Sequence, residues 1–531
     1  MNHFKNSLFL TLAILLLAGC KKFEQLEKDP NKPTQVTPGL VFNSVANDMY
    51  RRPWDMMQRW SQFYVSNYNY YGNQEYNWGG ATLNYTTLNN VQKMEEEAAR
   101  VGLPSKNPYT ALGKFFRAFF FYEMTMKVGD LPMREALQGI KNLTPKYDTQ
   151  KEIFKQVLVW LDEANSDLTA LVAANDNNLT GDIFYNNNLR SWQKAVNAFQ
   201  LRVLIALSKK ESEAELNVKQ RFAQVLNNGT QYPLFSGNAD NMVYTFNSQF
   251  NKYPTNPDNF GFDATRYNMS STFLNTLAGL KDPRTFYVAE PAGSKVKAGL
   301  LPTDYAAFVG ASPAQDLADM SSRAGKDNGA GYLPGEYSFF NRKRYYSSYT
   351  AEPTVQIGYP EMCFNIAEAI HRGWVTGNAE DWYKKGIQAS QALYGIQPGN
   401  LTVTFIKAGG SPTNAADYTN HTVNFDWTAY YSQPSVQYAG NNTTGLNQIL
   451  VQKYLAFYQN SGWEPYFNWR RTGVPGFEDN GPGTGNSGII PKRFQYPSSE
   501  INTNGANLNE AIQRQFGGGG DNINAAMWVI Q

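Results

Sequence analysis

Residues 109–128 read YTALGKFFRAFFFYEMTMKV and carry the apolar pattern of a helix. Large apolar side chains recur there at spacings of three and four positions, while Lys114, Arg117 and Glu123 lie outside that stripe. This spacing predicts an amphipathic α-helix that buries one face against the rest of the protein. An apolar side chain at helical spacing first needs a packing partner, so we expect the phenylalanines of this stretch in the core and not at a ligand.

The same periodicity recurs downstream and predicts a mainly α-helical protein. Further amphipathic helices are expected at residues 153–171, 192–207, 361–372, 380–393 and 446–458. The helices at 361–372 and 380–393 form a pair, because glycines separate them and Asn378 with Asp381 has the spacing of a capping box. The pair spans about 33 residues, close to the period of about 34 residues of tetratricopeptide repeats.

Cysteine is rare in this chain, and its two copies, Cys20 and Cys363, have different expected roles. Cys363 lies in the helix predicted at 361–372, where we expect it to pack as a small hydrophobic side chain. Cys20 ends the motif Leu17-Ala18-Gly19-Cys20, which follows a basic start and an apolar run too short to span a bilayer as a helix. This N-terminus is similar to the bacterial lipoprotein signal, so we expect a signal peptide at 1–19 and a lipid on Cys20. The alternative is a cytosolic protein with an apolar N-terminal strand.

The extent of the folded part follows from composition. Residues 20–38 are charged, punctuated by prolines and without apolar periodicity, so we expect a lipidated tether there. No linker-like stretch divides the chain after the tether, and residues 39–531 are therefore expected to form a single helical domain. The loops at 234–263, 301–346 and 402–445 exceed about 15 residues, and loops of that length carry function or contain short strands and hairpins.

Charge and motifs exclude several classes of function. Of the 531 residues, 47 are Lys or Arg and 45 are Asp or Glu, so the chain has no general positive field for nucleic acid or an anionic bilayer. The histidines that follow the signal, His371 and His421, are isolated, and no zinc motif, P-loop, complete dinucleotide fingerprint or nucleophile elbow appears. We therefore expect neither a cofactor nor catalytic residues. Bound calcium at 254–263 stays conceivable without EF-hand spacing, and a glycosidase carboxylate pair would be invisible in sequence.

Aromatic and amide side chains gather between Trp60 and Trp78. They include more rings than one short segment can bury, and those after Tyr68 alternate with Asn, Gly, Gln and Glu instead of apolar partners. Flat rings stack on the apolar faces of sugars, and amides hydrogen-bond to hydroxyl groups, so this loop, after a helix expected at 53–64, is the predicted ligand platform. The alternative is that the rings pack under the loop itself. The predicted ligand-binding residues are Asn69, Tyr70, Tyr71, Tyr76, Asn77 and Trp78, with a second wall from Arg342, Tyr345 and Tyr346 or from Trp427 and Tyr430.

Several segments of the chain, taken in order, resemble one known family. Behind the lipoprotein signal come EKDPNKPTQVTPGLVF (27–42), ALGKFFRAFFFYEMTMKVGDLPM (111–133), SWQKAVNAFQLRVLIALSK (191–209), LFSGNADNMVY (234–244), LAGLKDPRTFYVAEP (277–291), YPEMCFNIAEAIHRGW (359–374), EPYFNWRRTGVPGF (464–477) and IPKRFQYPSSEINTN (490–504). With these segments the chain resembles the SusD/RagB outer-membrane lipoproteins of Bacteroidetes, in particular SusD-like family 2.

The resemblance implies a fold and a role. The implied fold is mainly α, with about four tetratricopeptide-like helix pairs packed against a loop-rich region that has a few short strands. The implied role is binding: a lipid-anchored surface protein of the outer membrane captures oligosaccharides or oligopeptides and closes as a lid over a TonB-dependent SusC-like transporter. The repeat-bearing face would meet that transporter, so the polar stripe of the 361–372 helix, with Glu361 and Glu368, is a candidate contact. A surface endo-glycosidase, or a scaffold whose repeats only bind proteins, remains an alternative.

Overall fold

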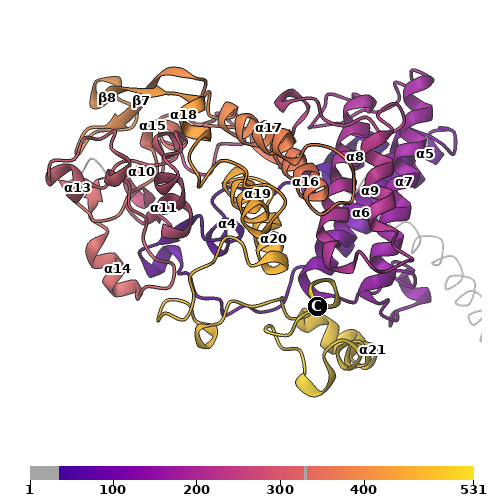
Figure 1. Ribbon diagram of the computed structural model, residues 1–531. Coiled ribbons are helices and arrows are strands. Elements are labelled where there is room, and N and C mark those ends of the chain that lie inside the picture. The colour runs from indigo at the N-terminus through magenta and orange to yellow at the C-terminus, as the bar shows by residue number, and fades with distance from the viewer. Residues whose placement is uncertain (1–34, 328–331) are drawn as a thin grey trace, which may run out of the picture.

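The computed structural model describes residues 35–327 and 332–531, and in this part of the chain helices dominate while the strands are few and short (Figure 1). The prediction of a mainly α-helical protein is confirmed. The predicted signal peptide, Cys20 and most of the tether lie outside the described residues. Helix α3 begins at Pro38, the last residue of the predicted tether.

Four helix pairs form the repeat-like part of the molecule. Each pair is joined by direct packing, and most of these helices stand together at the right of Figure 1. The pairs are α3 (Pro38–Asp48) with α5 (Tyr85–Arg100), α6 (Pro108–Val128) with α7 (Gln150–Ala173), α8 (Leu189–Ala206) with α9 (Val218–Asn227), and α16 (Tyr359–His371) with α17 (Ala379–Ala392). The expected four tetratricopeptide-like pairs are therefore present. Helices α6, α7, α8, α16 and α17 agree with the predicted helices to within a few residues, whereas α3, α5 and α9 were not predicted from periodicity.

Local sequence explains where these helices begin and end. The Asn107 side chain accepts hydrogen bonds from the backbone N–H groups of Tyr109 and Thr110 and caps α6, and Gly129, with φ of 96°, ends that helix. Asn378 is the N-cap of α17, as predicted, and its side chain accepts a hydrogen bond from the backbone N–H of Glu380 and not the predicted bond of a capping box with Asp381. The aromatic residues of α6 are buried as expected, and Glu123, which the pattern places outside the apolar stripe, is buried too because it pairs with Arg51.

Helices α19 (Thr443–Ala456) and α20 (Glu464–Thr472) pack against the last repeat pair and against α8. Buried arginines of α8 and α20 contact the polar stripe of α16. Glu361 accepts hydrogen bonds from Arg202 of α8, and Glu368 accepts them from Arg471 of α20. The expectation that these two glutamates form a partner-contacting face is therefore wrong, because both are buried inside the protein.

The rest of the chain forms a loop-rich region of short elements, at the left of Figure 1. Its helices are α4 (Met56–Trp60), α10 (Phe260–Asp263), α11 (Ser271–Gly279), α12 (Thr285–Val288), α13 (Gly293–Lys297), α14 (Leu317–Arg323), α15 (Arg342–Tyr345) and α18 (Trp427–Tyr431). The longer helix α21 (Ser498–Phe516) lies apart from them, at the lower right of Figure 1 near the C-terminus. The strands of the loop-rich region form four two-stranded antiparallel ladders: β1 (Tyr64–Ser66) with β3 (Tyr267–Met269), β2 (Met242–Tyr244) with β6 (Thr354–Ile357), β4 (Lys326–Asp327) with β5 (Tyr332–Leu333), and β7 (Gly399–Ile406) with β8 (Tyr418–Phe425).

The long loops contain short strands, as expected, but only some of these strands form hairpins. The β7–β8 hairpin lies largely within the predicted 402–445 loop, whereas β2, in the 234–263 loop, pairs with a strand far along the chain. Only five residues of the helix expected at 53–64 are helical, as α4. None of the helices in the described part of the chain is both long and apolar enough to cross a membrane.

The main apolar core includes side chains from Phe42 in α3 to Ile530 near the C-terminus. Aromatic rings make up much of it, and they come from the repeat helices and from the loop-rich region alike. Cys363 is buried, as predicted for a small hydrophobic side chain, and this burial raises the pKa of its thiol to about 12.

Candidate functional site

An exposed cluster of aromatic rings covers one edge of the loop-rich region. We call Tyr68, Tyr70, Tyr71 and Phe262 the aromatic platform. Tyr70 is 84% exposed and Phe262 is 72% exposed, which is unusual for side chains of this size. The ring centroids of Tyr70 and Tyr71 are 5.2 Å apart, and those of Tyr68 and Tyr71 are 6.3 Å apart, so the three tyrosines form a continuous surface.

Two segments that are distant in sequence build the platform. The tyrosines lie in and beside the short helix η1 (Asn69–Tyr71), and Phe262 lies on α10. The Tyr71 hydroxyl donates a hydrogen bond of 2.9 Å to the carbonyl oxygen of Phe262 and joins the two segments. The antiparallel pairing of β1 with β3 fixes the chain on either side of this contact.

Two arginine side chains hold η1 and the preceding Tyr68 in place. The Arg59 guanidinium donates a hydrogen bond of 3.1 Å to the carbonyl oxygen of Tyr71. Gly72, with φ of 107°, lets the backbone turn against this guanidinium, because a Cβ atom at that position would lie 2.4 Å from Arg59 Nη1. The Arg266 guanidinium stacks over the Tyr68 ring at 4.6 Å from its centroid. The exposed rings therefore have a defined backbone beneath them and are presented without a large ordering cost.

The polar groups beside the platform are few. Asn69 is exposed between the tyrosines, as predicted, and offers both a donor and an acceptor. Asp263 lies at the end of α10, accepts a hydrogen bond of 2.8 Å from the Tyr346 hydroxyl, and has its pKa raised to about 6 by burial. The charged groups beside the rings are therefore the Asp263 carboxyl and the Arg266 guanidinium.

The structure corrects the expectation for Tyr76 and Trp78. Both are buried, at 2% and 5% exposure, so the argument that this loop has too many rings to bury fails for them. The Tyr76 hydroxyl donates to the carbonyl oxygen of Trp60, and the Trp78 ring stacks on Phe494 at 4.2 Å. At this degree of burial neither ring offers a free stacking face. Trp78→Ala is consequently expected to open a cavity in the core and is no clean test of ligand binding.

Asn77 and an edge of Trp78 border a separate cleft of about 460 Å³ near the start of α5. Trp60, Trp463 and Phe494 form its aromatic wall, and basic side chains from the Tyr50–Asp55 stretch and from α6 lie opposite. Burial lowers the pKa of Lys127 in this cleft to about 8. Asn77 is exposed, but its side-chain oxygen already accepts a hydrogen bond from the backbone of Asn486.

The residues predicted as a second wall lie elsewhere. Arg342, Tyr345 and Tyr346 are buried, and this corrects the expectation that they face a ligand. Arg342 donates to the carbonyl oxygen of Ala264, and Tyr346 donates to Asp263, so these two side chains support α10 beneath the platform. Tyr345 packs edge-on against Trp54 inside the core.

Trp427 and Tyr430 lie on α18, at a different surface. Tyr430 is buried, and its hydroxyl donates to the carboxylate of Asp282, so it is also removed from the ligand-facing set. Trp427 is half-buried and borders a groove that shares no residue with the platform. The structure thus brings Asn69, Tyr70 and Tyr71 together and separates them from the other predicted residues.

Sequence reasoning missed Phe262, Arg266 and the contribution of Tyr68. Tyr68 stands in the run Tyr68-Asn69-Tyr70-Tyr71, so its aromatic neighbours were a usable signal. Phe262 and Arg266 had no comparable local signal, because their place beside the tyrosines depends on the pairing of β1 with β3.

Replacing Asp263 with asparagine is expected to change how stability depends on pH. The pKa of Asp263 is higher in the folded protein than in the unfolded chain, so the protonated carboxyl stabilises the fold at low pH. This contribution is lost as pH rises from about 4 through about 6. Asparagine keeps the acceptor for Tyr346 but cannot ionise. The variant should therefore exceed the wild type in free energy of unfolding by about 3 kcal/mol at pH 7 and match it below about pH 4. Urea unfolding at several pH values measures this, and a pH-independent difference would contradict it.

Among the described residues, no group of three or more His, Cys, Asp or Glu side chains is arranged to hold a metal ion.

A family model described as "Starch-binding associating with outer membrane" matches residues 30–497. A search of curated proteins found no match.

Solved structures of similar proteins share the fold. A SusD homolog from Bacteroides fragilis NCTC 9343 is 31% identical, and the alignment covers 93% of this chain and 100% of that chain with a TM-score of 0.78. A second SusD homolog from the same organism is also 31% identical, with 94% and 100% coverage and a TM-score of 0.75. A chitin-binding SusD homolog from Flavobacterium johnsoniae is 18% identical, with 93% and 98% coverage and a TM-score of 0.66, a likeness in fold alone.

Proposed function

We propose, since this chain belongs to SusD-like family 2, that it is a nutrient-binding protein of the outer membrane whose ligand-binding surface is the aromatic platform. The family description, starch-binding and associated with the outer membrane, supports this role. The observation that carries the proposal for this chain is the exposure of Tyr70 and Phe262 on a surface held in place by Arg59.

The chemistry of the platform favours neutral oligosaccharides. Exposed tyrosine rings present flat apolar faces to the C–H side of a sugar ring, and Asn69 can exchange hydrogen bonds with its hydroxyl groups. The net charge of +2 gives no strong general attraction for anionic polymers. Oligopeptides are the second ligand class, because backbone amides and aromatic side chains also pack on tyrosine rings.

We further propose that binding occurs without catalysis and that residues 39–531 act as one domain. The continuous apolar core from Phe42 to Ile530 supports a single folding unit. In the proposed role this domain is tethered by a lipid on Cys20, faces the cell surface, and acts as a lid that delivers its ligand to a SusC-like TonB-dependent transporter.

Titration of the soluble domain, residues 39–531, against panels of oligosaccharides and oligopeptides tests the proposed function. Calorimetry should find saturable binding to members of one panel, and chromatography of the same mixtures should find the ligand unchanged. Release of shorter products would favour the endo-glycosidase alternative. Absence of binding to both panels, together with intact assembly with the transporter, would favour the scaffold alternative.

The lipid anchor has its own test. Cys20→Ala should yield a soluble or signal-retaining protein that no longer fractionates with the outer membrane, because the variant lacks the thiol that accepts the lipid. Cys363→Ala is the matched control, since Cys363 is buried in α16 and should not affect fractionation. Outer-membrane recovery of Cys20→Ala equal to that of the wild type would contradict the anchor.

A further inference from the structure

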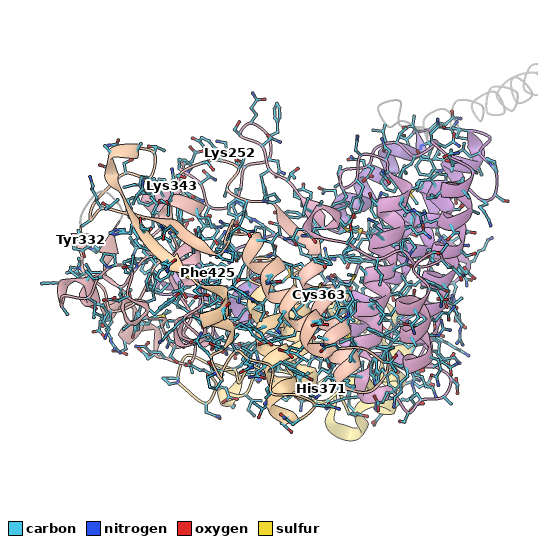
Figure 2. The ribbon with its side chains drawn as sticks, turned by 45° about the horizontal axis from the view of Figure 1, so that its top comes forward. Lys252, Tyr332, Lys343, Cys363, His371 and Phe425 are labelled. Atoms are coloured by element: carbon cyan, nitrogen blue, oxygen red, sulfur yellow. The ribbon has the colours of Figure 1, made fainter. Side chains whose placement is uncertain are left out.

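A groove of about 520 Å³ lies where the β7–β8 hairpin meets the last repeat pair. Figure 2 labels Phe425 at the foot of the hairpin and Cys363 in the neighbouring helix α16. The groove is bordered by the short helix η4 (Asn238–Asp240), the second half of α17 and the start of α18. The platform is built from η1 and α10 instead, so the two sites have no lining residue in common.

The groove is lined mainly by amides and aromatic rings. The amides are those of Asn238, Gln388, Gln391 and Gln397, and the rings are those of Tyr359, Phe425 and Trp427. Lys385 is the one charged side chain among its lining residues. Amides beside flat rings suit a ligand rich in neutral hydroxyl or acetamido groups, because each such group both donates and accepts hydrogen bonds.

One of these amides has an unmet hydrogen-bonding requirement. Gln391 is 2% exposed, and its side-chain nitrogen has no hydrogen-bond partner within the described residues. A buried donor without an acceptor is unfavourable, so its presence in a groove wall needs an explanation. An oxygen atom of a ligand seated in the groove would supply the acceptor.

The walls of the groove are fixed before any ligand arrives. The Asn238 side chain donates a hydrogen bond of 2.8 Å to the carbonyl oxygen of Ala389 and ties η4 to α17. The Trp427 ring stacks on Tyr431 at 5.6 Å with an interplanar angle of 21°, which sets its orientation. A preformed site loses little conformational freedom on binding.

We propose that this groove is a second binding site for a neutral oligosaccharide, with Gln391 as a hydrogen-bond donor and Trp427 as an apolar wall. The ligand class, a neutral oligosaccharide, rests on the proposed function. The location of this second site rests on the lining residues of the groove and on the unpaired side-chain nitrogen of Gln391. A chain with two sites could hold two parts of one long oligosaccharide, which strengthens binding of long ligands over short ones.

The test uses the double variant Tyr70→Ala/Tyr71→Ala as a background in which binding to the platform is weakened about 30-fold or more. Saturation-transfer NMR and calorimetry with maltohexaose and N-acetylchitohexaose measure the binding that remains. Trp427→Ala and Gln391→Leu are then added one at a time. Leucine is close in size to glutamine and removes the unpaired donor, so this variant should keep the thermal midpoint. Phe250→Ala, in which a 92% exposed ring outside both sites is removed, is the matched control.

The expected result is residual binding of at least one sugar in the background variant, weakened tenfold or more by Trp427→Ala and by Gln391→Leu and unchanged by Phe250→Ala. Residual binding that neither substitution weakens would overturn the groove as its location. Loss of all binding in the background variant, while the wild type binds, would overturn the second site and leave the proposed function intact. If the wild type binds neither sugar, both the groove and the platform are excluded as binding sites for maltohexaose and N-acetylchitohexaose.

Discussion

Glu368→Leu is expected to lower the free energy of unfolding by about 3–5 kcal/mol, the cost of leaving a buried charge without its partner. Glu368 has no exposed surface and accepts hydrogen bonds from both Nη atoms of Arg471 and from Nε of Arg372. Burial alone would raise the pKa of this carboxyl, but the Arg471 guanidinium and its neighbours hold it well below the usual range. The variant would leave Arg471 buried without a carboxylate.

Urea unfolding followed by circular dichroism measures this loss. Adding Arg471→Met to Glu368→Leu should recover part of the stability, because the second change removes the stranded charge. Glu96→Gln is the matched control, since Glu96 belongs to an exposed ion pair with Lys93 and should change stability little. A Glu368→Leu protein as stable as the control would show that the buried pair makes no net contribution.

The sign of the pH dependence follows from the lowered pKa. A carboxyl whose folded pKa lies below its unfolded value stabilises the fold above the unfolded value, and the contribution is lost as pH falls. Wild-type stability should therefore decline below about pH 4.5, the usual range of a glutamate, and this part of the decline should be absent in Glu368→Leu.

The double variant Tyr70→Ala/Tyr71→Ala is expected to bind the true ligand about 30-fold or more weakly, at about 1 kcal/mol for each lost ring. Tyr70 is exposed and makes only ring contacts, whereas Tyr71 also holds Phe262 through its hydroxyl. The loss should thus combine a missing stacking surface with a loosened neighbour. Calorimetric titration gives the affinity, and the thermal midpoint reports whether the fold is retained.

A separate pair of variants distinguishes these two contributions. Tyr71→Phe keeps the ring and removes only the hydrogen bond to the carbonyl oxygen of Phe262, so it should lose much less affinity than Tyr71→Ala. Phe250→Ala removes an exposed ring outside the platform and should bind as the wild type does. Unchanged affinity in the double variant would move the ligand site away from the platform.

Five of the eight repeat helices, α6, α7, α8, α16 and α17, could be predicted from the sequence because their signals are local. The apolar spacing in α6 and the cap at Asn378 involve residues within a turn or two of each other, and these segments are helical as predicted. The order of family-like segments likewise predicted the fold over nearly the whole chain.

Whether an individual polar or aromatic side chain is buried or exposed was decided only by the tertiary structure. Tyr70 and Trp78 stand in one loop of similar composition, yet Trp78 is buried because Trp463 and Phe494 reach it from the far end of the chain, and Tyr70 meets no such partner. Glu368 lies on a polar stripe that periodicity places at a surface, but Arg471 from α20 covers it. Periodicity identifies which face of a helix is polar, whereas burial depends on what packs on that face, and those partners are brought by contacts between residues hundreds of positions apart.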